Sequence, residues 1–326
     1  MMKKNILVSG ASFAGISTAY WMNRLGYNVT IIEIAEGLKK GGTPVNIREN
    51  TVDIVKRMGL LDQIRSNKLN MEAMEFRNAE DVTERMVIRE QIIDDEYEIE
   101  RDVLLNIMFE AIKDDVAFIF GDSITSLKEE ANGVEVAFKR GEKRTYDLVF
   151  DCDGIHSAVR KYSFGEETDF SHFLETYFSI TIVDKLLIRE NTTQVYNEPG
   201  RAGMGWRMPE LLEEVKNSTT FYFDKLCQMK MLSWIKGRVA LVGDAGYCAS
   251  PAAGMGGSLA IDGAAALADA FQNCQGDYEL AFQEYDKSFR PFIEEVQANA
   301  AMFVDFLVPR TEKAIRERNS QTGNDL

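Results

Sequence analysis

The chain has 326 residues, 45% of them hydrophobic and 27% charged, so it can bury a full core and has the composition of a folded globular protein. Acidic side chains outnumber basic ones by 52 to 37, and the net charge of -15 excludes nucleic acid as an expected partner because phosphate backbones would be repelled. Two histidines are too few for a histidine-rich metal site or a Ser-His-Asp device, so no metal is predicted and the chemistry is expected to come from a cofactor.

The cysteines and the start of the chain bear on its compartment. Cys152, Cys227, Cys248 and Cys274 form no CxxC pair and lie in apolar or small-residue surroundings, as reduced buried thiols do. The first residues contain no signal-peptide core, and no apolar run approaches the length of a membrane span. We therefore predict a cytoplasmic protein without a membrane span.

In chain order, the first elements form a βαβ unit: a buried strand over 6–8, a turn over 10–15, a helix over 16–25 and a strand over 29–33. The elements predicted after it are a helix over 51–66, strands of a half-exposed sheet over 71–93, a helix over 101–113, three strand segments of a β-meander between 117 and 154, two strands over 171–198, a short helix over 209–215, a buried strand over 238–244 and a helical region from 258 onward. This order predicts an α/β protein, with a Rossmann-type domain and its meander interleaved with a smaller β-sheet domain and followed by C-terminal helices.

The turn after the first strand has the pattern of a nucleotide-binding loop. In V-S-G-A-S-F-A-G, Gly10 and Gly15 take the first and last glycine positions of GxGxxG, and Ser12 replaces the middle glycine. Gly10 permits the tight turn, the small Ser12 lets the backbone approach a pyrophosphate, and Gly15 lets the helix lie close on the sheet. The helix then presents free amides and its positive end to the phosphates. A plain structural turn is the alternative interpretation, because the motif is imperfect.

Glu33 ends the second strand, roughly 20 residues after Gly10, where an acid can accept hydrogen bonds from both ribose hydroxyls. An acid at this position disfavours a 2'-phosphate, so the pattern favours FAD or NAD over NADP. A solvated glutamate at a strand end is the alternative, and spacing alone does not choose between FAD and NAD.

Two later segments resemble the flavin motifs of the aromatic-hydroxylase (class A) FAD monooxygenases. D-C-D-G-I-H-S-A-V-R, residues 151–160, resembles the family's Asp-Gly motif, and G-D-A-G-Y-C-A-S-P-A-A-G-M-G-G, residues 243–257, resembles its Gly-Asp motif. The similarity runs from Lys4 to about Gln297 and leans toward members that act on polycyclic or antibiotic-like substrates, including those that inactivate tetracyclines. It implies an FAD-binding domain made of 1–70, 97–165 and 228–326 and a truncated substrate domain made of 71–96 and 166–227.

The resemblance also implies FAD contacts. Asp244 would hold the ribityl chain, while Pro251 and the following glycines, including Gly257, would pass against the isoalloxazine ring, with the positive end of the next helix directed at the flavin pyrimidine. Arg48 and Arg101 resemble flavin-contacting arginines, with surface charges as the alternative, and Ile124 resembles the position whose backbone meets adenine. The predicted cofactor-binding residues are Gly10, Ser12, Ala14, Gly15, Glu33, Arg48, Arg101, Ile124, Asp153, Gly154, Gly243, Asp244, Pro251, Gly254, Met255 and Gly256.

The sequence departs from the family at two places. Between Arg160 and Arg238 the chain is shorter, so the substrate pocket is expected to be open, reshaped or completed by another subunit. Asp151 stands where the family has a small residue, usually glycine, two positions before the motif Asp153. Its carboxylate would repel a pyrophosphate unless it points away.

The resemblance implies an FAD-dependent oxidoreductase, a monooxygenase in which NADH or NADPH reduces FAD, O2 adds to give a flavin hydroperoxide, and oxygen passes to a small aromatic or polycyclic substrate. No catalytic residue is assigned, because Tyr177, Tyr196, Tyr222 and Trp206 are equally well interpreted as packing aromatics. Two alternatives stay open: an FAD-dependent dehydrogenase or reductase of the same fold, and a degenerate flavin- or ligand-binding protein that does not oxygenate.

Three smaller expectations complete the interpretation. Halogenation is disfavoured because G-W-R-M-P is only a fragment of the WxWxxP pattern of flavin halogenases. The run A-M-F-V-D-F-L-V-P is interpreted as part of a buried terminal helix, with a membrane or partner contact as the alternative. A monomer or a weak homo-oligomer is expected.

Overall fold

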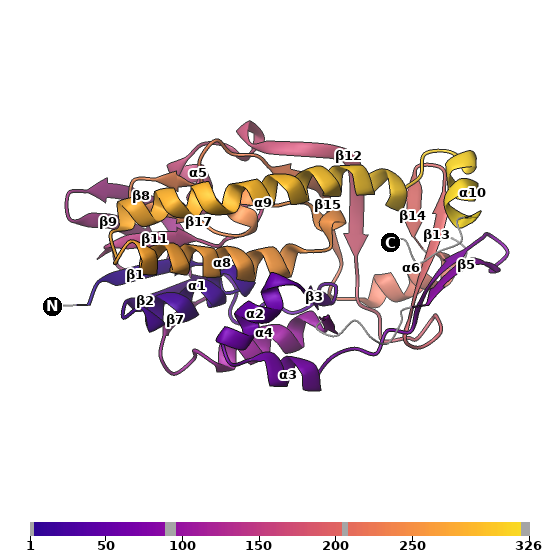
Figure 1. Ribbon diagram of the computed structural model, residues 1–326, viewed down its shortest axis with the longest axis horizontal. Helices are drawn as coiled ribbons and strands as arrows, with labels where there is room; N and C mark the ends of the chain where they lie inside the picture. Colours follow the sequence, from indigo (N-terminus) through magenta and orange to yellow (C-terminus); the bar gives the residue numbers. More distant parts are fainter. Residues whose placement is uncertain (1–2, 89–95, 204–207, 321–326) are drawn as a thin grey trace.

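The structure is a computed structural model that describes residues 3–88, 96–203 and 208–320 (Figure 1). Its largest sheet has six strands in the order β16-β17-β11-β1-β2-β7, all parallel to their neighbours except β16. The strands are β1 (Asn5–Ser9), β2 (Asn28–Glu33), β7 (Ala117–Phe120), β11 (Leu148–Asp151), β16 (Ile235–Lys236) and β17 (Val239–Leu241). Parallel strands end at one edge, so the carboxyl ends of β1, β2 and β11 open onto a common crevice.

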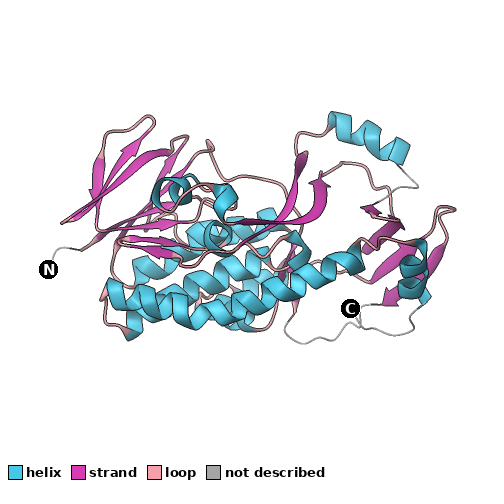
Figure 2. Cartoon of the chain, turned by 90° about the horizontal axis from the view of Figure 1, so that it is seen from above, coloured by secondary structure: helices cyan, strands magenta, loops and turns pink. Residues whose placement is uncertain are grey.

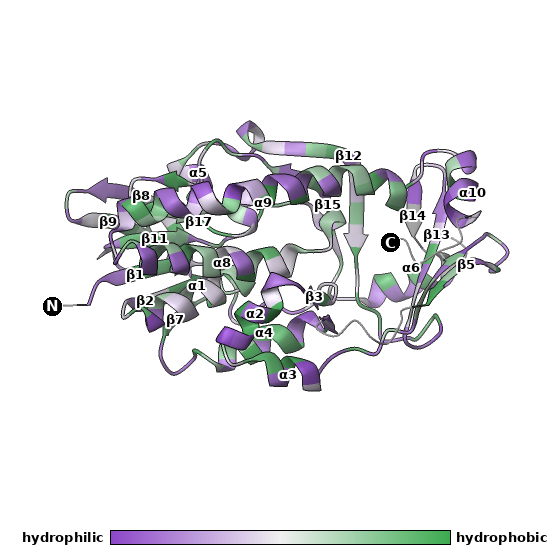
Figure 3. Cartoon of the chain, in the orientation of Figure 1, coloured by the Kyte–Doolittle hydropathy of each residue, from purple (hydrophilic) through white to green (hydrophobic). Residues whose placement is uncertain are grey.

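Alternate side chains of this sheet pack against two different layers. Ile6 and Val8 face a core formed with α1 (Phe13–Arg24), α8 (Gly256–Asn273) and α9 (Tyr278–Leu307). Leu7 and Val149 face the meander on the other side, which consists of β8 (Ile124–Glu130), β9 (Gly133–Phe138) and β10 (Arg144–Tyr146), with α5 (Ala158–Ser163) beside it. Figure 2 shows the helices and the meander on opposite sides, and Figure 3 shows the mostly hydrophobic strands between them. Both faces of the sheet are therefore covered, as a parallel sheet requires.

Two smaller sheets lie beyond the large one. A four-stranded sheet has the order β14-β13-β4-β5, and β12 pairs with β15 in an antiparallel ribbon. Their bounds are β4 (Ala73–Arg77), β5 (Thr83–Ile88), β12 (Ser171–Ile180), β13 (Thr192–Glu198), β14 (Arg201–Gly203) and β15 (Tyr222–Met229). The remaining elements are β3 (Val45–Ile47), α2 (Asn50–Arg57), α3 (Leu61–Ser66), β6 (Tyr97–Ile99), α4 (Arg101–Glu110), α6 (Met208–Asn217), α7 (Asp244–Tyr247) and α10 (Glu312–Ser320), with short 3-10 turns at Glu167–Asp169 and Pro251–Ala253.

The long helix α9 connects the large sheet to the four-stranded sheet (Figure 1). Its 30 residues extend roughly 45 Å at 1.5 Å per residue. At its end, the side-chain amide of Asn197 on β13 donates to the Leu307 carbonyl over 2.9 Å, and Phe306 packs edge-on against Phe76 of β4. The run over 301–309 is thus a helix end that is only partly buried: Val304 and Pro309 are buried, whereas Met302 and Phe303 are exposed.

Several predicted elements are divided in the structure. The helix expected over 51–66 breaks at Gly59, whose φ of +76° ends α2 before α3 begins. The meander segment from 117 to 130 also divides: β7 joins the large sheet, Gly121 turns the chain, and only β8 enters the meander. The last segment of the meander divides in the same way into β10 and β11. The helical region from 258 is three helices, and part of the strand region predicted over 71–93 lies outside the described residues.

Two observed elements bear on the domain limits predicted from the sequence. The limit after residue 227 falls within β15, which pairs along its length with β12. Residues 312–320, assigned to the FAD-binding part, form α10 and pack on β5 and β13 of the four-stranded sheet, where the buried guanidinium of Arg318 lies 4.5 Å from the Phe76 ring. None of the helices in the described ranges combines the length and apolar character needed to cross a membrane.

Candidate functional site

The turn between β1 and α1 has the close packing that its glycines predict. Gly10 has a φ of +99°, and its amide donates to the Ile32 carbonyl over 2.7 Å. A Cβ at Gly10 would lie 2.4 Å from the Cys152 carbonyl oxygen, and one at Gly15 would lie 1.8 Å from the Gly10 carbonyl oxygen. Ser12 precedes the helix, and its hydroxyl makes no capping bond to the helix amides. The first amides of α1 are therefore directed at the crevice above the strands.

Carboxylates end the strands on either side of this turn. Glu33 at the end of β2 accepts hydrogen bonds from the backbone amides of Ala11 (2.8 Å) and Ala35 (3.0 Å). Asp153, just after β11, accepts a 2.5 Å hydrogen bond from the Ser9 hydroxyl. Each carboxylate oxygen has a further lone pair, so Glu33 can still accept from a ribose hydroxyl beside the turn.

Asp151 points away from the crevice, which removes the repulsion that its position suggested. Its side chain is fully buried and accepts from the Ser157 hydroxyl (2.6 Å) and from the Asp153 amide (3.0 Å). Burial, reinforced by the charge of Asp153, holds the pKa of Asp151 well above its usual range. A carboxyl group held in this way is largely protonated near neutral pH and adds little negative charge next to a phosphate site.

The Gly-Asp segment lies against the same turn from the other side. Gly243 has a φ of +72°, and a Cβ there would lie 2.9 Å from the Cβ of Ala14. Asp244 follows at the start of α7, and burial raises its pKa. At Gly254 and Gly256 a Cβ would meet nothing within 4 Å, so both glycines border open space in front of α8. The segment therefore leaves room for a flat ligand to lie on its backbone.

These segments enclose one large cavity of about 490 Å³. The predicted residues that line it are Ser12, Ala14, Arg101, Gly154, Asp244, Pro251, Gly254, Gly256 and Gly257. The Arg101 guanidinium lies 3.1 Å from the Ser12 hydroxyl and 2.9 Å from the Lys39 carbonyl oxygen, at the amino end of α1. Three motifs that are far apart in the sequence thus meet at one cavity, as expected if they bind one dinucleotide.

The remaining predicted residues do not line the cavity. Gly10, Gly15 and Gly243 allow the close backbone packing next to the cavity, whereas Glu33 accepts from Ala11 in the β1–α1 turn and Asp153 accepts from Ser9 at the end of β1. The others, Ile124, Arg48 and Met255, lie elsewhere: Ile124 is buried in the core under the meander, Arg48 is half-buried after β3, and Met255 precedes α8.

The polar groups of the cavity fit a bound dinucleotide. Lys39, Lys40 and Arg101 line it against two acids, Asp224 and Asp244, which reverses the sign of the molecule's net charge, whereas Lys225 pairs with Tyr177 on the opposite face of the ribbon. Within the described part of the chain, nothing donates to the buried side-chain oxygen of Asn46, which also borders the cavity. An unpaired buried acceptor is costly, so a ligand with a ring N–H or a hydroxyl would satisfy it.

The far wall of the cavity is the β12–β15 ribbon, of which β12 falls within the strands predicted over 171–198, whereas β15 and its pairing were not predicted. Phe178 and Asp224 are paired across the ribbon, as are Ile180 and Tyr222, and all four line the cavity. Nothing in the sequence identified β15 as a strand, so its acid and its tyrosine had no assigned place. Residues 222–229 carry no clear strand signal, because apolar and polar residues do not alternate along them and only the second half of the strand is buried.

The four aromatic residues considered as catalytic candidates lie in different environments. Tyr222 faces the cavity, whereas Tyr177 is 58% exposed on the opposite face of the ribbon and stacks on Phe223. Tyr196 is buried in the four-stranded sheet and donates to Glu198, and Trp206 lies outside the described residues. Tyr222 is therefore the candidate whose geometry suits a ligand contact.

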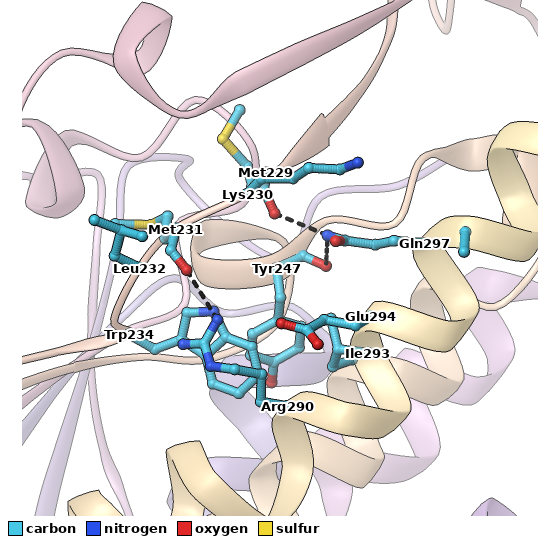
Figure 4. A pocket seen from close by; sticks show the side chains of 11 residues that line it. Met229, Lys230, Met231, Leu232, Trp234, Tyr247, Arg290, Ile293, Glu294 and Gln297 are labelled. Atoms are coloured by element: carbon cyan, nitrogen blue, oxygen red, sulfur yellow. Dashed lines mark hydrogen bonds between the residues drawn. The ribbon is translucent and has the colours of Figure 1, made fainter.

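A second cavity of about 270 Å³ lies between α9 and the segment that joins β15 to β16 (Figure 4). Its main polar groups already have protein partners. Arg290 lies over the Trp234 ring, donates to the Met231 carbonyl over 2.8 Å and pairs with Asp286, and the Gln297 amide donates to the Met229 carbonyl over 2.8 Å. We interpret these contacts as the attachment of α9 to the wall behind α7.

The fold and cavity together define a dinucleotide-binding flavoprotein: a parallel sheet with a glycine turn and an acid at the second strand, and two further motifs facing the same space. The family described as "FAD binding domain" matches residues 3–198, more than half of the chain. The chain belongs to this family, and the predictions of an α/β fold, of FAD as cofactor and of an FAD-dependent oxidoreductase of the monooxygenase type are confirmed.

Known proteins resemble the chain over nearly its whole length. A flavin-dependent monooxygenase of Legionella longbeachae is 34% identical over 91% of this chain and 88% of its own, and an uncharacterized protein of Mycobacterium tuberculosis is 33% identical over 90% and 92%. The crystal structure of the tetracycline destructase Tet(51) superposes with a TM-score of 0.85 and 31% identity, covering 98% of this chain and 95% of the other. The Legionella alignment runs over 346 positions, more than the 326 residues here, so that relative has residues without a counterpart in this chain.

Proposed function

We propose that this protein hydroxylates a small aromatic or polycyclic substrate with O2, using FAD and either NADH or NADPH. Bound FAD supplies the redox chemistry: it takes a hydride from the nicotinamide and activates O2. The observation that carries the proposal is the single cavity shared by the β1–α1 turn, the two flavin motifs and the β12–β15 ribbon. The names of the relatives, flavin-dependent monooxygenase and tetracycline destructase, support the reaction type and a polycyclic substrate.

In this proposal the chain's own residues hold the cofactor at three places. The α1 amides and Arg101 bind the pyrophosphate, Glu33 accepts from the adenosine ribose, and Asp244 binds the ribityl chain. The backbone at Gly254 and Gly256 accommodates the ring system, while Asn46 offers its unpaired oxygen. Phe178, Ile180 and Tyr222 line the same cavity and would shield a ring system bound there from water.

The organisation of the chain follows from the same proposal. We assign 1–70, 97–165 and 228–326 to FAD binding and 71–96 and 166–227 to the substrate side, with β15 shared and α10 packed on the substrate sheet. The residues missing relative to the relatives are proposed to belong to the substrate side. Four unpaired cysteines support a reducing, cytoplasmic compartment, and a monomer or weak homo-oligomer is proposed.

The test begins with the visible spectrum of the purified protein, which we expect to show bound oxidised flavin. NADPH or NADH should bleach it, air should restore it, and a substrate from a panel of phenols, quinones and tetracyclines should accelerate oxygen consumption. With isotopically labelled O2, one labelled oxygen atom should appear in the product. Anaerobic turnover with an artificial acceptor, combined with no oxygen incorporation from any panel member, would instead establish a dehydrogenase or reductase.

A further inference from the structure

The outer face of α9 carries an apolar patch beside the smaller cavity. Residues 296–304 contain no charged side chain, although several of them are exposed. Met302 is 68% exposed, and Ala298 is exposed on the same face one turn earlier. Leu232, in the segment between β15 and β16, is fully exposed and borders the cavity together with Ala298. Apolar side chains that gather in this way at the surface indicate an interaction site, whereas isolated ones do not.

The smaller cavity, of about 270 Å³, has room for an apolar side chain. Its lining residues Arg290 and Gln297 are already bound to other protein groups, and the buried rings of Trp234 and Tyr247 form part of its wall. Figure 4 shows the cavity between the α9 side chains and residues 229–232. The occupant expected for such a space is an apolar side chain, which gains free energy by leaving water.

The charges along this face of α9 make the face complementary to itself. One side of the helix is formed by positions that repeat at intervals of three and four residues: 287, 291, 294, 298, 302 and 305. Lys287 lies at one end of this stripe and Asp305 at the other, about 27 Å apart at 1.5 Å per residue. Asp305 also lies 3.4 Å from Arg310, in an exposed ion pair that water screens. When two such helices pack antiparallel, Lys287 of each copy faces the partner's Asp305, and the uncharged middle of the stripe is covered.

The same charges disfavour a membrane as the occupant of this face. Glu294, Glu295 and Asp305 flank the apolar patch, and the chain has a net charge of -15, so an anionic lipid surface would be repelled. Helices that lie on membranes instead have lysines and arginines beside their apolar face. Lys230 borders the cavity together with Glu294, so each copy presents both signs of charge there. A second copy of this chain can therefore pair with both.

From this arrangement we propose that two copies of the chain associate about a two-fold axis through the outer face of α9. The helices pack antiparallel with Ala298 near the centre, where its small side chain permits close approach, and Leu232 of each copy enters the smaller cavity of the other. A two-fold interface uses the same surface twice, so one patch and one cavity on each copy are sufficient. The stripe is narrow, so monomer and dimer are expected to exchange at micromolar concentrations. The inference concerns assembly and does not depend on the reaction proposed above.

The first test measures the mass of the full-length, FAD-loaded protein by analytical ultracentrifugation over a hundredfold range of concentration. The wild type should shift from monomer to dimer as the concentration rises. Leu232→Glu and Met302→Glu should each raise the dissociation constant at least tenfold, because each variant places a carboxylate in the apolar part of the interface. Leu212→Glu is the matched control, since Leu212 is an exposed leucine on α6, outside this face. All three variants should keep the flavin-to-protein absorbance ratio of the wild type, which checks that the fold is intact.

A pair of charge reversals tests the antiparallel arrangement. Lys287→Glu sets like charges against the partner's Asp305, and Asp305→Lys sets like charges against the partner's Lys287. Each variant alone should therefore stay monomeric at concentrations where the wild type is a dimer. Mixed in equal amounts, the two variants should form a heterodimer, because the introduced glutamate then faces the introduced lysine while the unchanged Lys287 faces the unchanged Asp305.

A monomer at every concentration would overturn the inference. So would self-association that Leu232→Glu and Met302→Glu leave unchanged, or a mixture of the charge-reversed variants that does not assemble. Wild-type binding to phosphatidylserine vesicles that is lost in Met302→Glu, without any self-association, would assign the face to a membrane instead. Dimerisation without oxygenation of any substrate would leave this inference standing and would count against the proposed function alone.

Discussion

Gly10 is a position where a single methyl group should decide cofactor binding. Its φ of +99° disfavours any other residue. A Cβ would also lie 2.4 Å from the carbonyl oxygen of Cys152, which follows β11, the neighbour of β1 in the sheet. Gly10→Ala should therefore displace the turn that holds the α1 amides and reduce the flavin content of the purified protein at least tenfold, as read from the flavin-to-protein absorbance ratio. Gly26→Ala is the control: Gly26 has a φ of +91° but open space around it, so backbone strain of about 1 kcal/mol acts there without a clash. Equal flavin loss in both variants would contradict the expectation.

Arg101 should contribute to affinity through its charge and its planar geometry. Burial lowers its pKa, yet the guanidinium remains charged at neutral pH and reaches the amino end of α1, beside Ser12. Arg101→Ala should weaken FAD binding by about 1.5–3 kcal/mol, the range for a hydrogen bond to a charged group, and Arg101→Lys should recover only part of it. A titration of apoprotein with FAD, followed by fluorescence quenching, measures both. Arg144→Ala, which removes an exposed arginine from β10, should leave the affinity unchanged.

At the scale of residues, the sequence was sufficient to predict a site residue where that residue belongs to a contiguous motif. Gly10, Ser12 and Asp244 were predicted because the turn that each one makes is encoded within a few residues of it. Asp224 was not, because it lies on β15, which borders the cavity together with its partner strand β12. That pairing depends on tertiary contacts that no local pattern records.

At the scale of elements, α8 carries a buried acid that should make stability depend on pH. Asp262 is 2% exposed in the middle of the helix and accepts from the Thr51 hydroxyl of α2 over 2.8 Å. Burial raises the pKa of Asp262 to about 7. A carboxyl group whose folded-state pKa is raised contributes stability that is complete below its unfolded value of about 4 and is lost as pH rises toward about 7.

The corresponding variant is Asp262→Asn, which keeps an acceptor for Thr51 and cannot ionise. The wild type should lose on the order of 1–3 kcal/mol of unfolding free energy between about pH 5 and pH 8 that the variant retains, as measured by urea denaturation. Asp269→Asn serves as the control, because Asp269 lies on the same helix in an exposed ion pair with Arg57. A pH dependence that persists unchanged in Asp262→Asn would assign it to another buried acid.

Elements were predictable where the pattern is local, as in β1, α1 and β2, whose strand–helix–strand order was expected from residues 6–33. The helix over 51–66 was predicted as one piece because its apolar spacing continues across Gly59, although the backbone there takes a positive φ. The strands on which α10 packs, β5 and β13, could not be predicted from its sequence because they precede it by more than a hundred residues. Helix formation is local, but the surface on which a helix packs is not.

At the scale of the whole molecule, the cavity is bounded by segments from both ends of the chain. A bound dinucleotide should therefore contact, and hold together, segments that are far apart in the sequence. The β1–α1 turn and Arg101 form one end, and residues 250–257 with the β12–β15 ribbon form the other. In the proposed arrangement FAD would span both ends, whereas ADP would occupy only the first. At a hundred times its dissociation constant, each ligand should stabilise the protein by about 2.7 kcal/mol, and this equality makes the two complexes comparable.

The two ligands should then differ in which amides they protect from hydrogen exchange. FAD should slow exchange in the α1 turn and also in residues 250–257, whereas ADP should protect the turn alone, because nothing in ADP reaches Gly254 or Gly256. Exchange in the meander, for example over β8 and β9, provides the internal reference, since these strands lie outside the cavity. If FAD protects no more than ADP does, the Gly-Asp segment does not carry the flavin ring. The cavity would then bind only the adenine half of the cofactor, which would leave the substrate wall at Tyr222 without a redox partner.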